Sequence, residues 1–371
     1  DSYFESISGF TSTGFTIFEN VKHLDQSLIM WRSSSQWIGG LYFLFSIILL
    51  IDIFDNSLKK SLTNFLTFNT SETLKQSSKI LILYTLLTFL IFVILNIFEF
   101  RIFDSFNLSM SLISSGGFLP INDLSTVLNT NAKEIIFALL MLVSFFSIFL
   151  SYNLLFVSKK NINFFQEDIY LFLYFIILIF LFFLLFNSEY NFSTILLSLT
   201  SSISNIGVSL DQSPQNLSFV YLMLVIIGGS FFSTSSGIRF LKIYALCKFS
   251  INDLISHVRP KNIFLNNNFF LKINFQKVEI DKYFLSVLIF IISMFLLSSI
   301  LTFSGISLEN SFKLSILTLM NTVNSSMYGI EYFNFQELQF YTKLYLIIFM
   351  IIGRVELLTL LIICKKFLFK N

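Results

Sequence analysis

Apolar runs of about twenty residues recur along the sequence, and they restrict its possible folds more than any other feature. A helix of this length crosses the ~30 Å hydrocarbon core of a membrane. Hydrophobic residues make up 55% of the 371 residues and charged residues only 12%, about half the share that soluble domains carry. We therefore expect an all-α, polytopic membrane protein. The longest runs cover residues 79–98, 135–157, 169–186, 283–303 and 344–364.

Basic residues gather at one side of these runs. The opposite loops carry only scattered Lys22, Arg101 and Lys133. Because cytoplasmic loops of membrane proteins are enriched in Lys and Arg, we expect the basic side to face the cytoplasm. A net charge of +2 without a basic stripe argues against nucleic-acid binding. The basic clusters lie at 59–60, 75–79, 159–160, 248–282 and 365–370.

A unit of helix, short half-helix, polar loop and helix repeats along the chain, and such internal repetition indicates a pseudo-symmetric fold. The polar loops are centred near residues 14, 117, 207 and 327. The chain begins inside its first unit, so we expect an outer helix to precede it. The predicted organisation is a partial unit 1 over 1–55, unit 2 over 79–158, unit 3 over 168–248, a cytoplasmic connection over 249–281 and unit 4 over 282–366.

Serine, threonine and glycine dominate these loops, as in the first one at 8–14, which reads SGFTSTG. Glycine permits the left-handed turns that aim successive carbonyls at one axis. Non-helical backbone at membrane depth is tolerated only where protein buries it or where it lines a water-filled path. Four loops that converge on one axis meet this condition, and their carbonyls can replace the hydration shell of a cation. The alternative is that they are extracellular linkers built from turn residues.

Six segments share their composition and their order with a known family. They are SGFTSTG at 8–14, WRSSSQWIGG at 31–40, SSGGF at 114–118, GG at 228–229, STSSGIR at 233–239 and GRVE at 353–356. They resemble motifs of the Trk/Ktr/HKT superfamily of potassium transporters, most closely the bacterial Trk-type membrane subunit. The resemblance implies four pseudo-repeated units around one central pore, with an ion filter made of loop carbonyls.

The resemblance further implies that the residues at each central glycine present carbonyls to the ion. In the fourth loop, Met327 stands at the expected glycine position, and a side chain there changes the loop path or adds strain of about 1 kcal/mol. This departure makes a sodium-permeable or non-selective transporter of the same fold an alternative. The implied filter residues are Ser12, Thr13, Gly14, Ser115, Gly116, Gly117, Asn205, Ile206, Gly207, Ser325, Ser326 and Met327.

Arg354 lies eleven residues from the nearest lysine on either side, roughly 16 Å along a helix. A guanidinium so deep in a membrane is costly and indicates function. We expect it to form an electrostatic barrier below the filter; the alternative is a buried pair with Glu5 or Glu356. Arg32 is expected to hold the first half-helix through Glu5.

The Gly/Ser-rich break in the third unit resembles the gating loop of the family. The alternative is a helix kink whose backbone is satisfied by Ser and Thr side chains. The predicted gate residues are Gly228, Gly229, Ser235, Ser236 and Gly237.

No ligand-spaced His or Cys cluster and no Ser/His/Asp arrangement occurs in the sequence, and Glu167-Asp168 is expected to lie in a cytoplasmic turn. An intramembrane enzyme would need acidic or His groups within its spans, so we expect neither an enzyme nor a cofactor. The resemblance implies uptake of potassium, bound as the transported ion at the filter, across the cell inner membrane. It also implies a lipid-embedded homodimer and a cytoplasmic nucleotide-binding regulatory subunit. A degenerate, non-transporting homologue is the remaining alternative.

Overall fold

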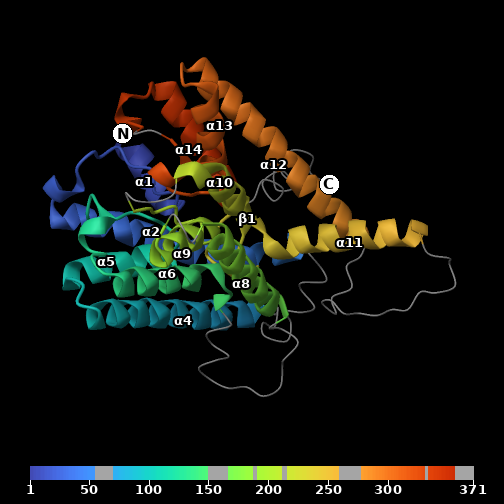
Figure 1. Ribbon diagram of the computed structural model, residues 1–371, viewed down its shortest axis with the longest axis horizontal. Coiled ribbons are helices and arrows are strands. Elements are labelled where there is room, and N and C mark those ends of the chain that lie inside the picture. The colour runs from blue at the N-terminus through green and yellow to red at the C-terminus, as the bar shows by residue number, and fades with distance from the viewer. Residues whose placement is uncertain are drawn as a thin grey trace.

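The computed structural model describes residues 1–54, 70–148, 166–186, 190–210, 215–258, 277–330 and 333–355. Within these ranges the chain is a bundle of helices with one pair of two-residue strands (Figure 1). The prediction of an all-α fold is confirmed. Among the described helices, Ser77–Ile97, Glu167–Leu185 and Glu279–Phe303 are long and apolar enough to cross a membrane. The chain is therefore a helical membrane protein.

Three long helices form the outer layer, namely α4 (Thr70–Ile97), α8 (Gln166–Phe186) and α12 (Lys277–Phe303). Their outward side chains are large and apolar, and Phe89, Phe180 and Phe284 are each more than 60% exposed. A helix that is apolar on all sides is stable only in a core or in lipid. These side chains therefore face the hydrocarbon of the membrane.

Four half-helices lie inside this layer, namely α1 (Ser2–Phe10), α5 (Ile102–Ile113), α9 (Phe192–Ile203) and α13 (Leu308–Leu319). At 1.5 Å per residue they are about 14–18 Å long, so each reaches only halfway through a membrane. The last residues of α5, α9 and α13 are buried, with Ile113, Ile203 and Leu319 at most 3% exposed, and Thr11, which follows α1, is buried as well. The loops that follow therefore begin in the middle of the protein.

The inner helices are α2 (Gln26–Phe54), α6 (Asn131–Phe145), α10 (Ser218–Ile226) with its continuation α11 (Phe240–Val258), and α14 (Phe340–Val355). Each half-helix packs against the inner helix of the preceding unit, α5 on α2, α9 on α6 and α13 on α10. The first half-helix, α1, packs on the last inner helix, α14. The four units thus close a ring around one axis.

A close approach between α1 and α2 depends on Gly39, because a Cβ atom there would clash with the carbonyl oxygen of Phe10. Its neighbour Gly40 faces the other way, and a Cβ atom there would clash with Tyr84 and Ser114. The outer loops contain the 3-10 turns η1 (Val21–His23), η2 (Leu124–Thr126), η4 (Gln215–Leu217), η5 (Ser326–Tyr328) and η6 (Phe335–Glu337).

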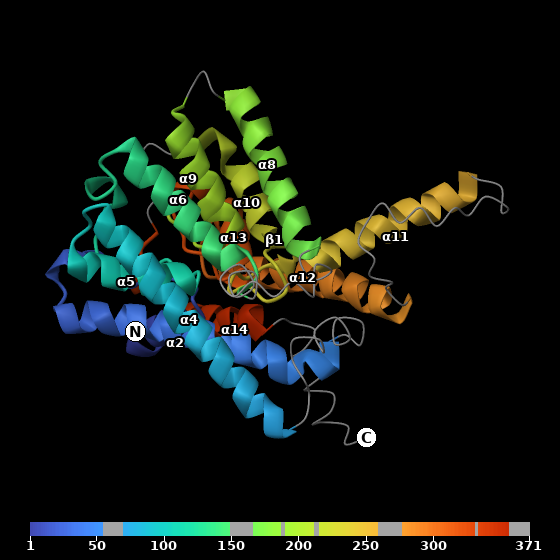
Figure 2. The same cartoon turned by 90° about the horizontal axis from the view of Figure 1, so that it is seen from below.

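Two helix ends differ from the predicted spans. Helix α6 ends at Phe145 rather than near 157, because the loop of the third unit donates hydrogen bonds to its last carbonyls. Helix α11 continues to Val258, past the predicted boundary at 248, and projects away from the bundle beside α12 (Figure 2). Most of the predicted connection 249–281, and the predicted end of unit 4 at 366, lie outside the described residues.

Candidate functional site

The four half-helices end in the same backbone geometry. One residue after each helix cap has a left-handed φ of 48–59° although it is not glycine. The N–H of the next residue donates to the carbonyl five residues back, at 2.9–3.1 Å, which is the Schellman pattern of helix termination. The left-handed residues are Ser12, Ser115, Asn205 and Asn321.

The side chains of these left-handed residues anchor each loop to the elements around it. Three of them donate hydrogen bonds to backbone carbonyls, and Ser12 Oγ accepts one from a guanidinium. The bonds are Ser115 Oγ to Thr234 O (2.9 Å), Asn205 Nδ2 to Val225 O (2.8 Å), Asn321 Nδ2 to Met350 O (2.9 Å) and Arg354 Nη2 to Ser12 Oγ (3.3 Å). In each loop, the non-glycine residue with the left-handed φ therefore also supplies the side chain that anchors the loop.

Two residues further on, the first three loops have a glycine with φ of 71–77°, at Gly14, Gly117 and Gly207. The same position in the fourth loop is Val323. A β-branched residue is strongly disfavoured in the left-handed region, and Val323 is not among the described residues with positive φ. The fourth loop therefore leaves the common backbone path at this residue.

The structure thereby corrects the predicted register of the fourth loop. Hydroxyl residues before Met327 suggested that Ser325, Ser326 and Met327 match the other filters. Instead, Ser326 and Met327 lie in η5, where the Met327 side chain is fully buried. The loop begins four residues earlier because α13 ends at Leu319. The residues that match the other three loops are Asn321, Thr322 and Val323.

The four loops lie against one another. A Cβ atom added at any of the three glycines would lie 2.5–2.6 Å from a carbonyl oxygen of the next loop. The glycine–carbonyl pairs are Gly14–Gly116, Gly117–Ile206 and Gly207–Val323. This ring of glycines and carbonyls brings the predicted filter residues of the first three loops together around one axis.

Side chains also link the loops directly. Asn321 Nδ2 donates to Thr13 Oγ1 at 2.9 Å, which joins the fourth loop to the first. Asn205 Nδ2 donates to Thr322 Oγ1 at 3.3 Å, which joins the third loop to the fourth. These two amides link the first, third and fourth loops to one another.

Gln36 on α2 fixes the second loop from behind. Its Nε2 donates to the carbonyl of Gly116 at 2.6 Å, and its Oε1 accepts from the N–H of Phe118 at 3.2 Å. The Gly116 carbonyl, a predicted ion ligand, therefore has a protein hydrogen-bond donor in this structure.

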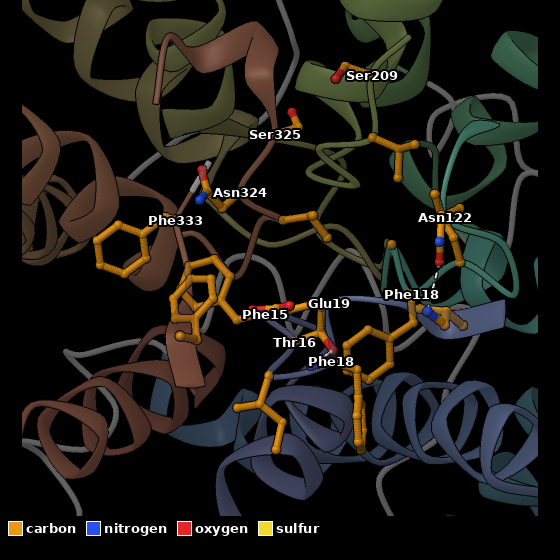
Figure 3. A pocket seen from close by; sticks show the side chains of 18 of the residues that line it. Phe15, Thr16, Phe18, Glu19, Phe118, Asn122, Ser209, Asn324, Ser325 and Phe333 are labelled. Atoms are coloured by element: carbon orange, nitrogen blue, oxygen red, sulfur yellow. Dashed lines mark hydrogen bonds between the residues drawn. The ribbon is translucent and has the colours of Figure 1, made fainter. Parts of the chain in front are cut away.

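An open cavity of about 550 Å³ leads from the outer face to the loops, and we call it the outer vestibule. Gly14, Gly117 and Val323 form part of its lining. Figure 3 shows Asn324 and Ser325 on one side of it and Phe118 on another. Glu19, Asp123 and Arg32 also line the vestibule. Because Arg32 is paired with Glu5, the charge of the lining is acidic and favours the entry of cations over anions.

Arg354 lies on the inner side of the loops and is 6% exposed. Its Nη1 donates to Ser236 Oγ at 2.8 Å, and its guanidinium carbon lies 4.3 Å from the ring centroid of Phe43. Neither alternative partner pairs with it in the described residues. Glu5 instead pairs with Arg32 at 2.9 Å, as the sequence predicted for Arg32, and Glu356 lies outside the described residues.

The Gly/Ser break in the third unit is a folded loop rather than a simple kink. It runs between β1 (Ile227–Gly228) and β2 (Ile238–Arg239), which pair in parallel. Thr234 Oγ1 donates to the carbonyl of Ile113 at 2.6 Å, which brings the loop beneath the end of α5.

The predicted gate residues shape this break. Gly229 N–H donates to Ser235 Oγ at 3.0 Å, and Ser236 accepts the bond from Arg354. Gly237 has a φ of 85°. A Cβ atom at Gly237 would also lie 2.8 Å from the Cα of Gly228. The close approach of the chain to β1 therefore requires glycine at position 237.

Glu167 and Asp168 lie in the first turn of α8, not in a turn of the cytoplasmic surface as the sequence suggested. Glu167 Oε1 accepts from the N–H of Phe231 at 3.0 Å, inside the break. Asp168 Oδ1, on a buried side chain, accepts from the N–H of Ser147 at 3.1 Å. This acidic pair holds the break and the end of α6, and it was missed because its partners are distant in sequence.

Arg239 is a second buried guanidinium in the same region. Its Nη1 donates to the carbonyls of Ser230 at 3.1 Å and Ser235 at 3.0 Å, and its carbon lies 5.1 Å from the ring centroid of Phe43. Two arginines therefore flank one phenylalanine at the break. The sequence placed Arg239 in a motif but not in the site.

Comparisons with known proteins agree with this geometry. No protein-family profile matches the chain. An uncharacterized cation transporter of Methanocaldococcus jannaschii is 27% identical over 288 residues, which cover 72% of this chain and 56% of that protein. The Trk system potassium uptake protein TrkG of Escherichia coli is 25% identical, over 100% of this chain and 79% of that protein.

A solved structure shows the same fold. The crystal structure of the potassium transporter TrkH from Vibrio parahaemolyticus superposes with a TM-score of 0.78 at 21% identity, over 98% of this chain and 77% of that chain. These matches confirm the resemblance found in the motifs. The prediction that the chain is not an enzyme is also confirmed, since the relatives are named as transporters. The chain spans little more than half of the archaeal relative.

Proposed function

We propose that this homologue of the Trk/Ktr/HKT superfamily carries potassium ions through a filter of backbone carbonyls between its four loops. The main support is the common left-handed turn at the end of four half-helices that pack in a closed ring. Carbonyls around such an axis replace the hydration shell of a cation. The C-terminal ends of the half-helices carry partial negative charge toward the same place. Both effects favour a dehydrated cation over an anion.

Potassium is the proposed substrate because the bacterial relatives are named as potassium uptake proteins. It is transported cargo, and we propose no cofactor. The proposed location is the cell inner membrane, with the basic clusters on the cytoplasmic side. A second copy of the chain and a cytoplasmic nucleotide-binding regulatory subunit are the proposed partners, as the resemblance implies.

The break of the third unit and Arg354 form the proposed gate on the inner side of the filter. Arg354 places a positive charge beside Ser12, within the first loop. A fixed charge at this depth repels a cation that leaves the filter. Its bond to Ser236 ties the barrier to the break, so movement of the break also moves the charge.

The filter can be tested with Gly14→Ser in the full-length protein, expressed in cells that lack their own potassium uptake. The φ of 76° at Gly14 disfavours any side chain, and the new Cβ would lie 2.5 Å from the Gly116 carbonyl. We expect rubidium uptake to fall by about tenfold or more, since a misplaced carbonyl ring loses transition-state contacts worth over 1.4 kcal/mol.

Gly305→Ser is the matched control. Gly305 has a φ of 93°, yet nothing lies within 4 Å of an added Cβ, so the backbone strain is similar and the filter is untouched. Unchanged uptake by Gly14→Ser at equal amounts of membrane protein would overturn the filter. If the unmutated protein takes up sodium and not rubidium, the sodium-permeable alternative is favoured.

A further inference from the structure

The fourth loop places a side chain where the other three have none. Its residue at the glycine position is Val323, and the residue is partly exposed at the base of the outer vestibule. The Cγ2 methyl of Val323 would clash with a Cβ added at Gly14 and with one added at Gly117. This methyl group therefore contacts the backbone of two other loops at the level of their glycines.

The positions of those loops decide where the methyl group lies. The packing order of the ring makes unit 4 the neighbour of units 1 and 3, and places unit 2 opposite to it. Gly14 belongs to the adjacent unit and Gly117 to the opposite one. A side chain that reaches both must cross the space enclosed by the loops. The Val323 side chain thus lies in the space between the four loops and not on their outer side.

The backbone of the fourth loop shifts as well. In the second and third loops, the carbonyl that faces the neighbouring glycine belongs to the residue before the glycine, at Gly116 and Ile206. In the fourth loop it belongs to Val323 itself. The fourth carbonyl is therefore one residue out of step with the second and third.

We propose that Val323 is the residue that sets the rate and the ion selectivity of passage through this filter. An ion at this level meets the isopropyl group of the fourth loop, whose facing carbonyl is out of step with those of the second and third loops. Apolar constrictions in a pore disfavour both water and hydrated ions. The isopropyl group therefore restricts flux, and the displaced fourth carbonyl weakens the preference for potassium over sodium. This proposal rests on the proposed function.

A side-chain series at this position tests the proposal in the full-length protein, with rubidium uptake and competition by sodium as the readouts. Val323→Gly is expected to raise uptake by about tenfold or more, since the ion regains a ligand and loses an apolar barrier. Val323→Ala should be intermediate and Val323→Ile lower than the unmutated protein. Val127→Gly, in the outer loop after η2, removes the same atoms away from the path and should change nothing.

The outcomes separate the two proposals. Equal uptake and equal sodium competition for Gly, Ala, Val and Ile at 323 would overturn the role of Val323 and leave the filter standing. No uptake by any of the four, with each present in the membrane, would overturn transport itself. If Val323→Gly fails to reach the membrane, the order of Ala, Val and Ile still decides, because the proposal requires uptake to fall as the side chain grows.

Discussion

Replacing Arg354 with glutamine tests how the inner barrier is held closed. The guanidinium donates to Ser236 Oγ at 2.8 Å and, over a longer 3.3 Å, to Ser12 Oγ. A hydrogen bond from a charged donor contributes about 1.5–3 kcal/mol. The guanidinium also lies 4.3 Å from the Phe43 ring centroid in a desolvated site, which adds about 2 kcal/mol.

Glutamine retains at most one neutral hydrogen bond to Ser236, of about 1 kcal/mol. The closed arrangement then loses about 3 kcal/mol, which changes the ratio of closed to open molecules by about 100-fold. The change also removes the positive charge from the ion path. Both effects act in the same direction, so Arg354→Gln should raise the rate of rubidium uptake.

The assay is the initial rate of rubidium uptake into liposomes that contain the purified protein. Our proposals place Val323 and Arg354 in series along the ion path, so the increase should be larger when Val323 is also replaced by glycine. Arg101→Gln is the control, because the Arg101 side chain is 85% exposed. An unchanged or lower rate for Arg354→Gln in both backgrounds, at equal protein, would refute both the proposed barrier and the role of the Arg354 hydrogen bonds in holding it closed.

Two further predictions concern acidic side chains that accept hydrogen bonds inside the protein. Glu5→Gln leaves the Arg32 guanidinium buried without its carboxylate, which costs about 3–5 kcal/mol. The Tm of the protein in detergent should therefore drop clearly. The control is Glu309→Gln, which should leave the Tm nearly unchanged because the carboxylate side chain of that ion pair is 76% exposed. Glu167→Ala removes the acceptor for the N–H of Phe231, and an unsatisfied buried donor costs about 1–3 kcal/mol. We therefore expect the break to loosen and rubidium uptake to rise. Glu167→Gln keeps an acceptor oxygen and should have a smaller effect. Equal Tm values for the two glutamine variants, or equal uptake for the two Glu167 variants, would contradict these assignments.

The membrane class and the repeated unit follow from the sequence alone. Apolar runs long enough to span a membrane, and short amphipathic stretches that are not, are local properties that a helix shows in its own composition. The glycines of the first three loops can be identified from the sequence, since only glycine adopts a positive φ at these positions without strain. The pairing of Arg32 with Glu5 was also predicted, and the structure has the two side chains 2.9 Å apart.

Tertiary structure alone decided the rest. The fourth loop has no glycine at the decisive position, so its register depends on where α13 ends. That end is set by packing against α10 and α14, which the local sequence does not reveal. Glu167 reaches the break across 64 residues of chain, and Val323 reaches Gly14 and Gly117 only because the ring closes. Contacts between distant segments are fixed by the folded backbone, and they determine which side chain lies between the four loops.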